Sequence, residues 1–216
     1  MLEFLRNRGV QYLVHFTRID NLPSVLRNGL LSRDELQAQE IRHSYNDPYR
    51  FDHLSNGTCL SITFPNYKMF YRLRQEHPEQ DWAVLRIDPA IVGQKRCVFN
   101  YENAASKQLS TLSAESRMGI EALRGMFNDH DGMPTRSALR IPENLPTNPQ
   151  AEILVLDHIE PRYILEVAID TKDRVKDMNS IIALAKEHNG APRFVHDRSL
   201  FDARVDYAHW RVQQNG

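Results

Sequence analysis

A glutamate stands at the start of an aliphatic run in the stretch PQAEILV, residues 149–155. The three aliphatic residues after Glu152 favour a buried strand, and a strand would hold the glutamate side chain rigidly at its first position. A carboxylate held in this way can stabilise a developing positive charge or accept a proton during a reaction. The same pattern also fits an ordinary glutamate at the edge of a strand, so the stretch alone leaves both interpretations open.

Two further polar side chains, His15 and Arg50, are candidates for binding a ligand. His15 lies inside the apolar run YLVHFT (12–17), where it is either a hydrogen-bonded core histidine or a polar group at the bottom of a cleft. Arg50 lies in the turn NDPYRFD (46–52), whose proline would rigidify the loop. Such an arginine can offer its planar fork to a phosphate, or it can pair with a neighbouring aspartate at the surface.

The length and composition limit the class of protein. The 216 residues carry 27 basic and 28 acidic side chains, which argues against coating nucleic acid by bulk electrostatics but leaves room for a locally basic groove. No apolar run is long enough for a membrane span, and the N-terminus lacks the apolar region of a signal peptide. Cys59 and Cys97 show no metal-binding or redox spacing, so we expect two buried, reduced thiols in a cytoplasmic protein.

Several common catalytic motifs are missing from the sequence. It contains no Walker-type phosphate-binding loop, no GxGxxG dinucleotide fingerprint and no GxSxG nucleophile elbow. These absences disfavour a P-loop enzyme, a Rossmann enzyme and a Ser-His-Asp hydrolase. Candidate metal ligands are scattered along the chain, and we expect no metal.

Strands and short helices must position the residues that could do chemistry. Alternating and β-branched patterns predict strands at 12–17, 58–64, 81–92, 97–100, 151–159, 163–169 and 194–196. A short helix should follow the first strand, capped by Asp20 or Asn21, with Pro23 in its first turn and its end at Asn28–Gly29.

Further helices are predicted at 66–77 and 176–189, and long loops at 40–57 and 128–150. Strands make up most of the predicted core, which indicates an α+β fold. No composition shift marks a boundary, so we expect one domain over residues 1–216.

Four features follow one another along the chain: a histidine in the first strand, a loop with an arginine, a strand with small polar residues and a late Gln-x-Glu. In this order they resemble the pattern of an ADP-ribosyltransferase. The stretch YLVHFTRIDNLPSVLRNGLLS (12–32) closely resembles the start of the DarT family, the nucleic-acid ADP-ribosyltransferase toxins of DarTG toxin–antitoxin systems. The NDPYRFD loop, the KMFYRLR helix and the PQAEILV strand follow in the family's order. The resemblance spans residues 10–165 and leaves the tail unassigned.

The resemblance implies an ADP-ribosyltransferase-like fold, with a central, mostly antiparallel split β-sheet, flanking helices and long loops. It implies transfer of ADP-ribose from NAD+ to a base of single-stranded DNA, with release of nicotinamide and a role in toxin–antitoxin or phage defence. NDPYRFD and CVFNYENAAS (97–106) look more like the guanine-modifying branch than the thymine-modifying one. An antitoxin that removes the modification would be a separate chain. RNA or protein acceptors, or a non-catalytic nucleotide-binding module, remain as alternatives.

The resemblance also assigns roles to residues that handle NAD+. Glu152 would be the catalytic glutamate, close to the oxocarbenium-like cation that forms when the nicotinamide–ribose bond breaks. Arg50 would grip the pyrophosphate or press the nicotinamide ribose into its reactive shape. The remaining cofactor-binding residues would be His15, Phe16 (through its backbone), Thr17, Asn21, Gly29, Ser61 and Tyr71, the last of which could equally be a core aromatic.

The loop at 128–150 would then recognise the acceptor. Gln150 would hydrogen-bond the acceptor base, and Arg136 and Arg140 would neutralise phosphates. Tyr45 or Phe127 would stack on a base taken out of the strand.

Overall fold

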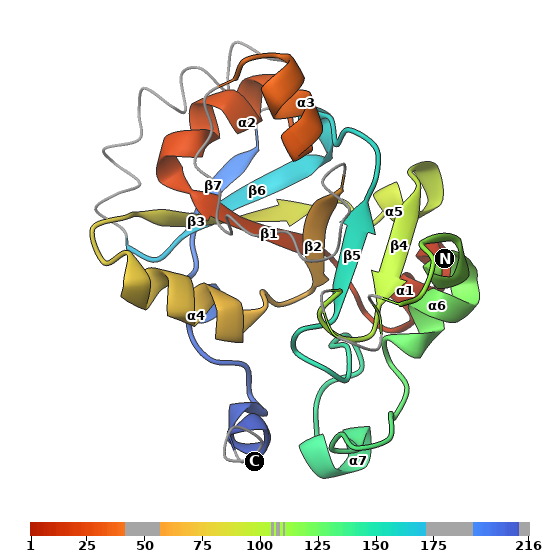
Figure 1. Ribbon diagram of the computed structural model, residues 1–216. Helices are drawn as coiled ribbons and strands as arrows, with labels where there is room; N and C mark the ends of the chain where they lie inside the picture. The colour runs from red at the N-terminus through yellow and green to blue at the C-terminus, as the bar shows by residue number, and fades with distance from the viewer. Residues whose placement is uncertain (42–56, 105, 107–108, 110, 172–191, 212–216) are drawn as a thin grey trace.

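The computed structural model describes residues 1–41, 57–104, 106, 109, 111–171 and 192–211. Within them a seven-stranded sheet has the order β4-β5-β2-β1-β3-β6-β7 (Figure 1). All neighbouring strands are antiparallel except β6 and β7. The strands are β1 Leu13–Arg18, β2 Thr58–Ile62, β3 Trp82–Ile87, β4 Cys97–Asn100, β5 Glu152–Val155, β6 Ile164–Ile169 and β7 Arg193–His196. Each predicted strand is present, and the α+β class is confirmed. The strands predicted to end at 64, 92 and 159 end earlier, at Ile62, Ile87 and Val155, and a short helix begins at Ile91.

The sheet divides between β1 and β2. These strands share only the pairs Leu13↔Ile62 and Val14↔Ser61, whereas β1 pairs with β3 along all six of its residues. The expected split sheet is confirmed, with β4-β5-β2 on one side of the division and β1-β3-β6-β7 on the other.

Short helices flank the two parts of the sheet (Figure 1). They are α1 Leu2–Asn7, α2 Leu22–Asn28, α3 Arg33–Ala38, α4 Tyr67–Glu76, α5 Ile91–Gln94, α6 Gly119–Gly125 and α7 Arg136–Leu139. The 3-10 turns are η1 Ile19–Asn21, η2 Glu115–Arg117, η3 Pro161–Tyr163, η4 Arg198–Phe201 and η5 Tyr207–Trp210. The helix predicted at 176–189 lies outside the described residues. No helix among the described residues is long and apolar enough to cross a membrane.

Alternation along β1 sends its side chains to two apolar clusters. Leu13 packs in the larger cluster with Leu22 and Val25 of α2. Val14 packs in a second cluster with Phe70 of α4. Burial of these side chains on both faces is the main force that fixes β1 at the centre of the sheet.

The two cysteines are free, as expected from their spacing. Cys97 is buried, and burial together with the nearby charge of Asp157 raises the pKa of its thiol to about 12. Cys59 is only half-buried, so the expectation of two buried thiols holds for Cys97 alone.

A charged network ties β3, β6 and the segment after β7 together. The nearly buried Glu166 accepts hydrogen bonds from Arg86 and Arg193, and Arg86 also pairs with Asp197. Burial alone would raise the pKa of Glu166, but the two arginines lower it below its usual value. Burial likewise opposes ionisation of Asp197, whose pKa is nevertheless lowered by Ser199 and Arg86.

Because both folded-state pKa values are lowered, this network stabilises the fold at neutral pH, and the contribution is lost as the pH falls through those values. We expect the free energy of unfolding, measured by urea titration, to fall as the pH drops below about 4. Glu166→Gln should lower stability at pH 7 and flatten this acid dependence. A Glu166→Gln variant that keeps the full acid dependence of the wild type would contradict this assignment.

Candidate active site

Glu152 is the first residue of β5, which lies between β4 and β2 (Figure 1). The residue is half-buried, and its Oε1 accepts a hydrogen bond from the backbone N–H of Ala104 at 2.6 Å. The strand therefore fixes the backbone of Glu152, and the turn after β4 orients its carboxylate. The sequence-based expectation that Glu152 stands at the start of a strand is confirmed.

Ser61 lies next to Glu152 in the sheet. The pairing of β2 with β5 runs from Thr58↔Val155 to Leu60↔Ile153, and one further step in this register places Ser61 opposite Glu152. Residues opposite each other in an antiparallel pair point to the same face. Ser61 is itself a small, buried residue.

A buried Asn100–Arg117 pair supports the other side of Glu152, and the sequence did not indicate it. Asn100 is the cross-strand partner of Glu152 and is fully buried. Its Oδ1 accepts from Arg117 Nη1 at 2.6 Å, while its Nδ2 has no hydrogen-bond partner among the described residues. Arg117, itself 7% exposed, also donates to the carbonyl oxygens of Ser113 and Leu112. A buried cation therefore lies close to the carboxylate site, held by neutral groups.

Removal of the Arg117 guanidinium would leave the buried oxygen of Asn100 without a donor. We expect Arg117→Leu to lower the free energy of unfolding by roughly 1–3 kcal/mol, the usual cost of a buried unpaired polar group. The matched control is Arg124→Leu, because Arg124 is exposed and its ion pair is with the exposed Glu121. Urea titration of the two variants measures the difference, and equal losses would show that the Asn100 contact contributes nothing.

His15 spans the division between β1 and β2. Its Nδ1 lies 2.8 Å from the carbonyl oxygen of Cys59, beyond the point where the ladder stops at Val14↔Ser61. A carbonyl can only accept, so Nδ1 carries the proton and donates it to the oxygen of Cys59. The ring thus replaces the missing backbone pairing and is half-buried at the sheet division.

The other residues predicted around the first strand are fixed by the fold. Thr17 and Asn21 are buried, and Asn21 Nδ2 donates to Thr17 Oγ1 at 3.1 Å. The ring of Phe16 stacks on Phe70 of α4 with centroids 4.6 Å apart, which leaves its backbone as the part that could meet a ligand. The roles of these three residues toward a cofactor stay predictions.

Gly29 and Tyr71 occupy very different environments. Gly29 has φ +80°, and a Cβ built there would lie 2.1 Å from the carbonyl oxygen of Ile159, so the close approach seen here is to the chain itself. Tyr71 on α4 is 58% exposed, so the alternative that it is a core aromatic is wrong. A stacking role for Tyr71 and a cofactor role for Gly29 stay predictions.

Four of the predicted acceptor residues lie in the described part of the chain, and their environments differ. Gln150 is half-buried two residues before Glu152, and its N–H donates to Asn148 Oδ1 at 2.9 Å. Arg140 is exposed with φ +50°. The guanidinium of Arg136 instead donates to carbonyl oxygens of its own loop. Phe127 is buried in the core, which excludes it as a stacking platform.

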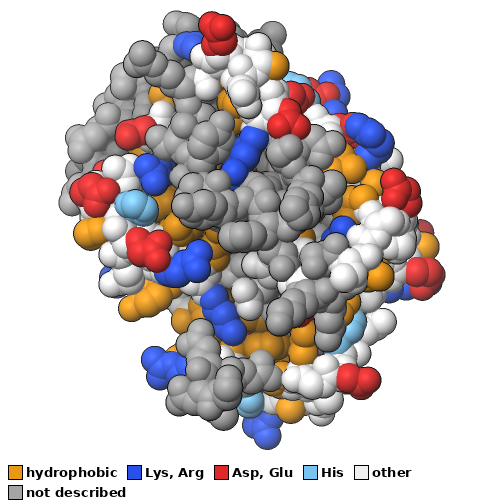
Figure 2. Space-filling view, in the orientation of Figure 1, with side chains coloured by type: hydrophobic (Ala, Val, Ile, Leu, Met, Phe, Trp, Pro, Cys, Tyr) orange, Lys and Arg blue, Asp and Glu red, His pale blue; other side chains and the backbone are white. Residues whose placement is uncertain are grey.

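Tyr45 and Arg50 lie outside the described residues. On the face drawn in Figure 2, basic and acidic side chains are interspersed among the coloured residues.

Solved structures with the same fold are DarT proteins. Thermus sp. 2.9 DarT in complex with carba-NAD+ matches with a TM-score of 0.59 and 18% identity, over 89% of this chain and 98% of that one. The same protein in complex with ADP-ribosylated ssDNA matches with a TM-score of 0.54 and 16% identity, over 90% of this chain and 97% of that one. Likeness at these identities establishes that this chain has the fold of these DarT structures.

Thermosipho africanus DarTG in complex with ADP-ribose matches with a TM-score of 0.56 and 20% identity. The match covers 88% of this chain and 51% of that one, so this chain spans about half of that protein. Comparison with curated proteins gives no match. A family model described as "ssDNA thymidine ADP-ribosyltransferase, DarT" matches residues 14–201. That range is most of the chain, and the chain belongs to the DarT family.

Proposed function

We propose that this chain transfers ADP-ribose from NAD+ to a base of single-stranded DNA, with Glu152 as the catalytic carboxylate. The observation that carries the proposal is the fixed carboxylate of Glu152 at the start of β5, in a chain of the DarT family. Further support comes from Thermus sp. 2.9 DarT, which has been solved with NAD+ and with ADP-ribosylated ssDNA.

In the proposed reaction the bond between nicotinamide and C1′ of its ribose breaks, and the bonding electron pair leaves with nicotinamide. The ribose acquires oxocarbenium character, which the negative charge of Glu152 stabilises. A nitrogen of the acceptor base then attacks C1′, and its proton passes to the carboxylate. Nicotinamide and an ADP-ribosylated base are the products.

The other predicted cofactor-binding residues would hold NAD+. His15, Thr17 and the backbone of Phe16 would hold the nicotinamide amide and its ribose. Arg50 would bind the pyrophosphate, Asn21 the adenosine side, and Tyr71 would stack on nicotinamide. Further contributions to NAD+ binding would come from Ser61 and Gly29.

We further propose that the acceptor base is guanine, hydrogen-bonded by the donor and acceptor groups of the Gln150 amide. The resemblance of CVFNYENAAS to the guanine-modifying branch supports this choice, whereas the family description names thymidine. Arg140, and Tyr45 from the 40–57 loop, would contact the strand around that base. The DarTG relative supports a toxin role with an antitoxin partner that removes the modification, in phage defence or a related system.

The test uses NAD+ that carries a label on its adenine and measures how much label each acceptor takes up. Wild-type protein should transfer label to single-stranded DNA and not to RNA or to a protein lysate. Oligonucleotides that each lack one base should all accept label except the one without guanine. Loss of labelling only without thymine would overturn the guanine assignment and keep the DNA transferase. Label in RNA or protein but not in DNA would overturn the proposed function.

A further inference from the structure

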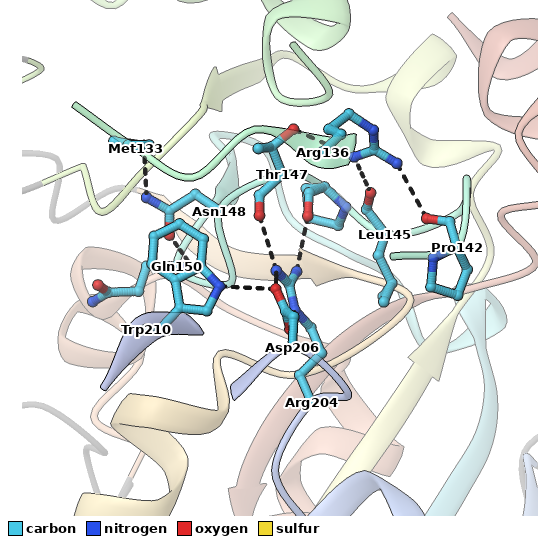
Figure 3. Close-up of polar contacts among 11 residues, drawn as sticks. Met133, Arg136, Pro142, Leu145, Thr147, Asn148, Gln150, Arg204, Asp206 and Trp210 are labelled. Carbon is cyan, nitrogen blue, oxygen red and sulfur yellow. Dashed lines mark hydrogen bonds and ion pairs between the residues drawn. The ribbon is translucent and has the colours of Figure 1, made fainter. Parts of the chain in front are cut away.

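Residues 192–211 contribute a buried charged cluster that none of the roles above uses. Arg204 and Asp206 are 2% and 1% exposed, and they form an ion pair through two hydrogen bonds. The indole Nε1 of Trp210 donates to the same carboxylate at 2.8 Å (Figure 3). The family match ends at residue 201, so this cluster lies beyond it.

The arginine of this cluster also binds the loop that leads to Glu152. Arg204 Nη1 donates to the carbonyl oxygen of Pro146 at 2.8 Å, and Nη2 donates to that of Thr147 at 2.9 Å (Figure 3). These carbonyls belong to the buried stretch 145–149, which is neither strand nor helix. Buried irregular backbone needs hydrogen-bond partners from elsewhere, and the fork of Arg204 supplies them for these two carbonyls.

Other side chains hold the same loop from different directions. Arg136 Nη1 donates to the carbonyl oxygen of Leu145 at 2.8 Å, and its Nη2 to that of Pro142 at 3.1 Å. Thr63, just after β2, donates through Oγ1 to the carbonyl oxygen of Asn144 at 2.8 Å. The segment 142–147 is therefore fixed by the tail, by α7 and by the sheet.

This fixed segment continues directly into the site. Asn148 Oδ1 accepts from the N–H of Gln150, and the Asn148 carbonyl accepts from the N–H of Ala151 at 3.1 Å. A shift of the backbone at Pro146 or Thr147 should therefore also displace Gln150 and Glu152, which follow a few residues later.

We propose that Arg204 is a positioning residue for the acceptor substrate: with Asp206 and Trp210 it holds 145–148 so that Gln150 presents the base to the reacting ribose. The inference rests on the proposed DNA transferase function. Attack on C1′ needs the base nitrogen in near-attack geometry, and small displacements cost rate steeply. The residues of β1 and η1 that are proposed to bind NAD+ make no hydrogen bond to Arg204, Asp206 or Trp210 in the described part of the chain. Loss of the Arg204 contacts should therefore impair DNA transfer more than NAD+ binding.

The test is Arg204→Lys in the full chain. Lysine keeps the charge against Asp206, but one ammonium cannot reproduce the fork that binds a carboxylate and two carbonyls at once. We expect kcat/KM for a single-stranded oligonucleotide to fall roughly 10- to 100-fold, while the dissociation constant for NAD+ is unchanged. Amides of residues 143–148 should exchange hydrogen faster. The matched control is Arg198→Lys, an exposed arginine of the same segment, which should behave as wild type.

The outcomes separate this inference from the proposed function. If wild type and Arg204→Lys modify DNA equally, the positioning role is wrong and the transferase stands. A variant that loses NAD+ affinity and DNA transfer in equal measure has a general defect, and this also overturns the positioning role. If wild type modifies no DNA, the proposed function fails first, and the inference with it.

Should Arg204→Lys not fold, Trp210→Phe removes the indole donor to Asp206, together with part of the buried ring that packs in the Leu139 cluster. This variant should then show a smaller fall in kcat/KM for the oligonucleotide, again with unchanged NAD+ affinity. If kcat/KM does not fall selectively, the positioning role is wrong.

Discussion

Glu152→Gln is expected to abolish nearly all transfer while the protein still folds and binds NAD+. Glutamine has nearly the same shape, and its oxygen can still accept the hydrogen bond that Ala104 donates to Oε1. It carries no charge to stabilise the oxocarbenium-like state and cannot take the proton of the base. We expect the transfer rate to fall by about 100- to 10,000-fold, the range typical for loss of a positioned acid–base group.

The measurement is the rate of label transfer from NAD+ to an oligonucleotide, with NAD+ affinity and the urea midpoint measured beside it. Glu121→Gln is the matched control, because Glu121 is an exposed carboxylate whose ion pair is with Arg124 at the surface. A variant at Glu152 that keeps wild-type transfer would contradict the assignment. A variant that loses NAD+ affinity in the same proportion would make Glu152 a binding residue instead.

Gly29→Ala is expected to cause the largest loss of stability. Gly29 ends α2 with φ +80° and ψ −165°, a conformation essentially restricted to glycine. An added Cβ would also lie 2.1 Å from the carbonyl oxygen of Ile159, where Leu30 and Ile159 form a β-bridge. The backbone on one or both sides must shift, so we expect a loss of roughly 3–5 kcal/mol in the free energy of unfolding.

Gly9→Ala separates the conformational cost from the clash. Gly9 also has a positive φ, +72°, but nothing lies within 4 Å of its added Cβ. Its alanine variant should lose only the cost of a left-handed residue, about 1–2 kcal/mol. Equal losses at the two glycines would refute the packing argument. Reduced NAD+ affinity in a fully stable Gly29→Ala protein would instead show that Gly29 serves the cofactor.

Local patterns were enough to predict the elements that hold the site. The aliphatic runs predicted β1 and β5, and thereby placed His15 inside a strand and Glu152 at a strand start. The helix after β1 ends at Asn28 as predicted, but Asn21 does not cap it through its side chain. That amide donates to Thr17 instead, a contact that competes with capping.

Long-range contacts could not be predicted in this way. Arg204 binds carbonyls 57 and 58 positions earlier in the chain, and nothing in either segment specifies the other. Asn100 and Arg117 are likewise joined only by the fold. The loop at 128–150 was expected to be irregular, yet Thr135 caps the four-residue helix α7 within it, which is too short to show periodicity.

The most direct test of the central claim is tandem mass spectrometry of one mixed-sequence single-stranded oligonucleotide after incubation with NAD+ and the protein. We predict a gain of one ADP-ribosyl group whose fragments assign it to a nucleobase, and no gain with Glu152→Gln. Release of nicotinamide without a mass gain on the oligonucleotide, or attachment at a terminal phosphate, would contradict the claim that this chain modifies DNA bases.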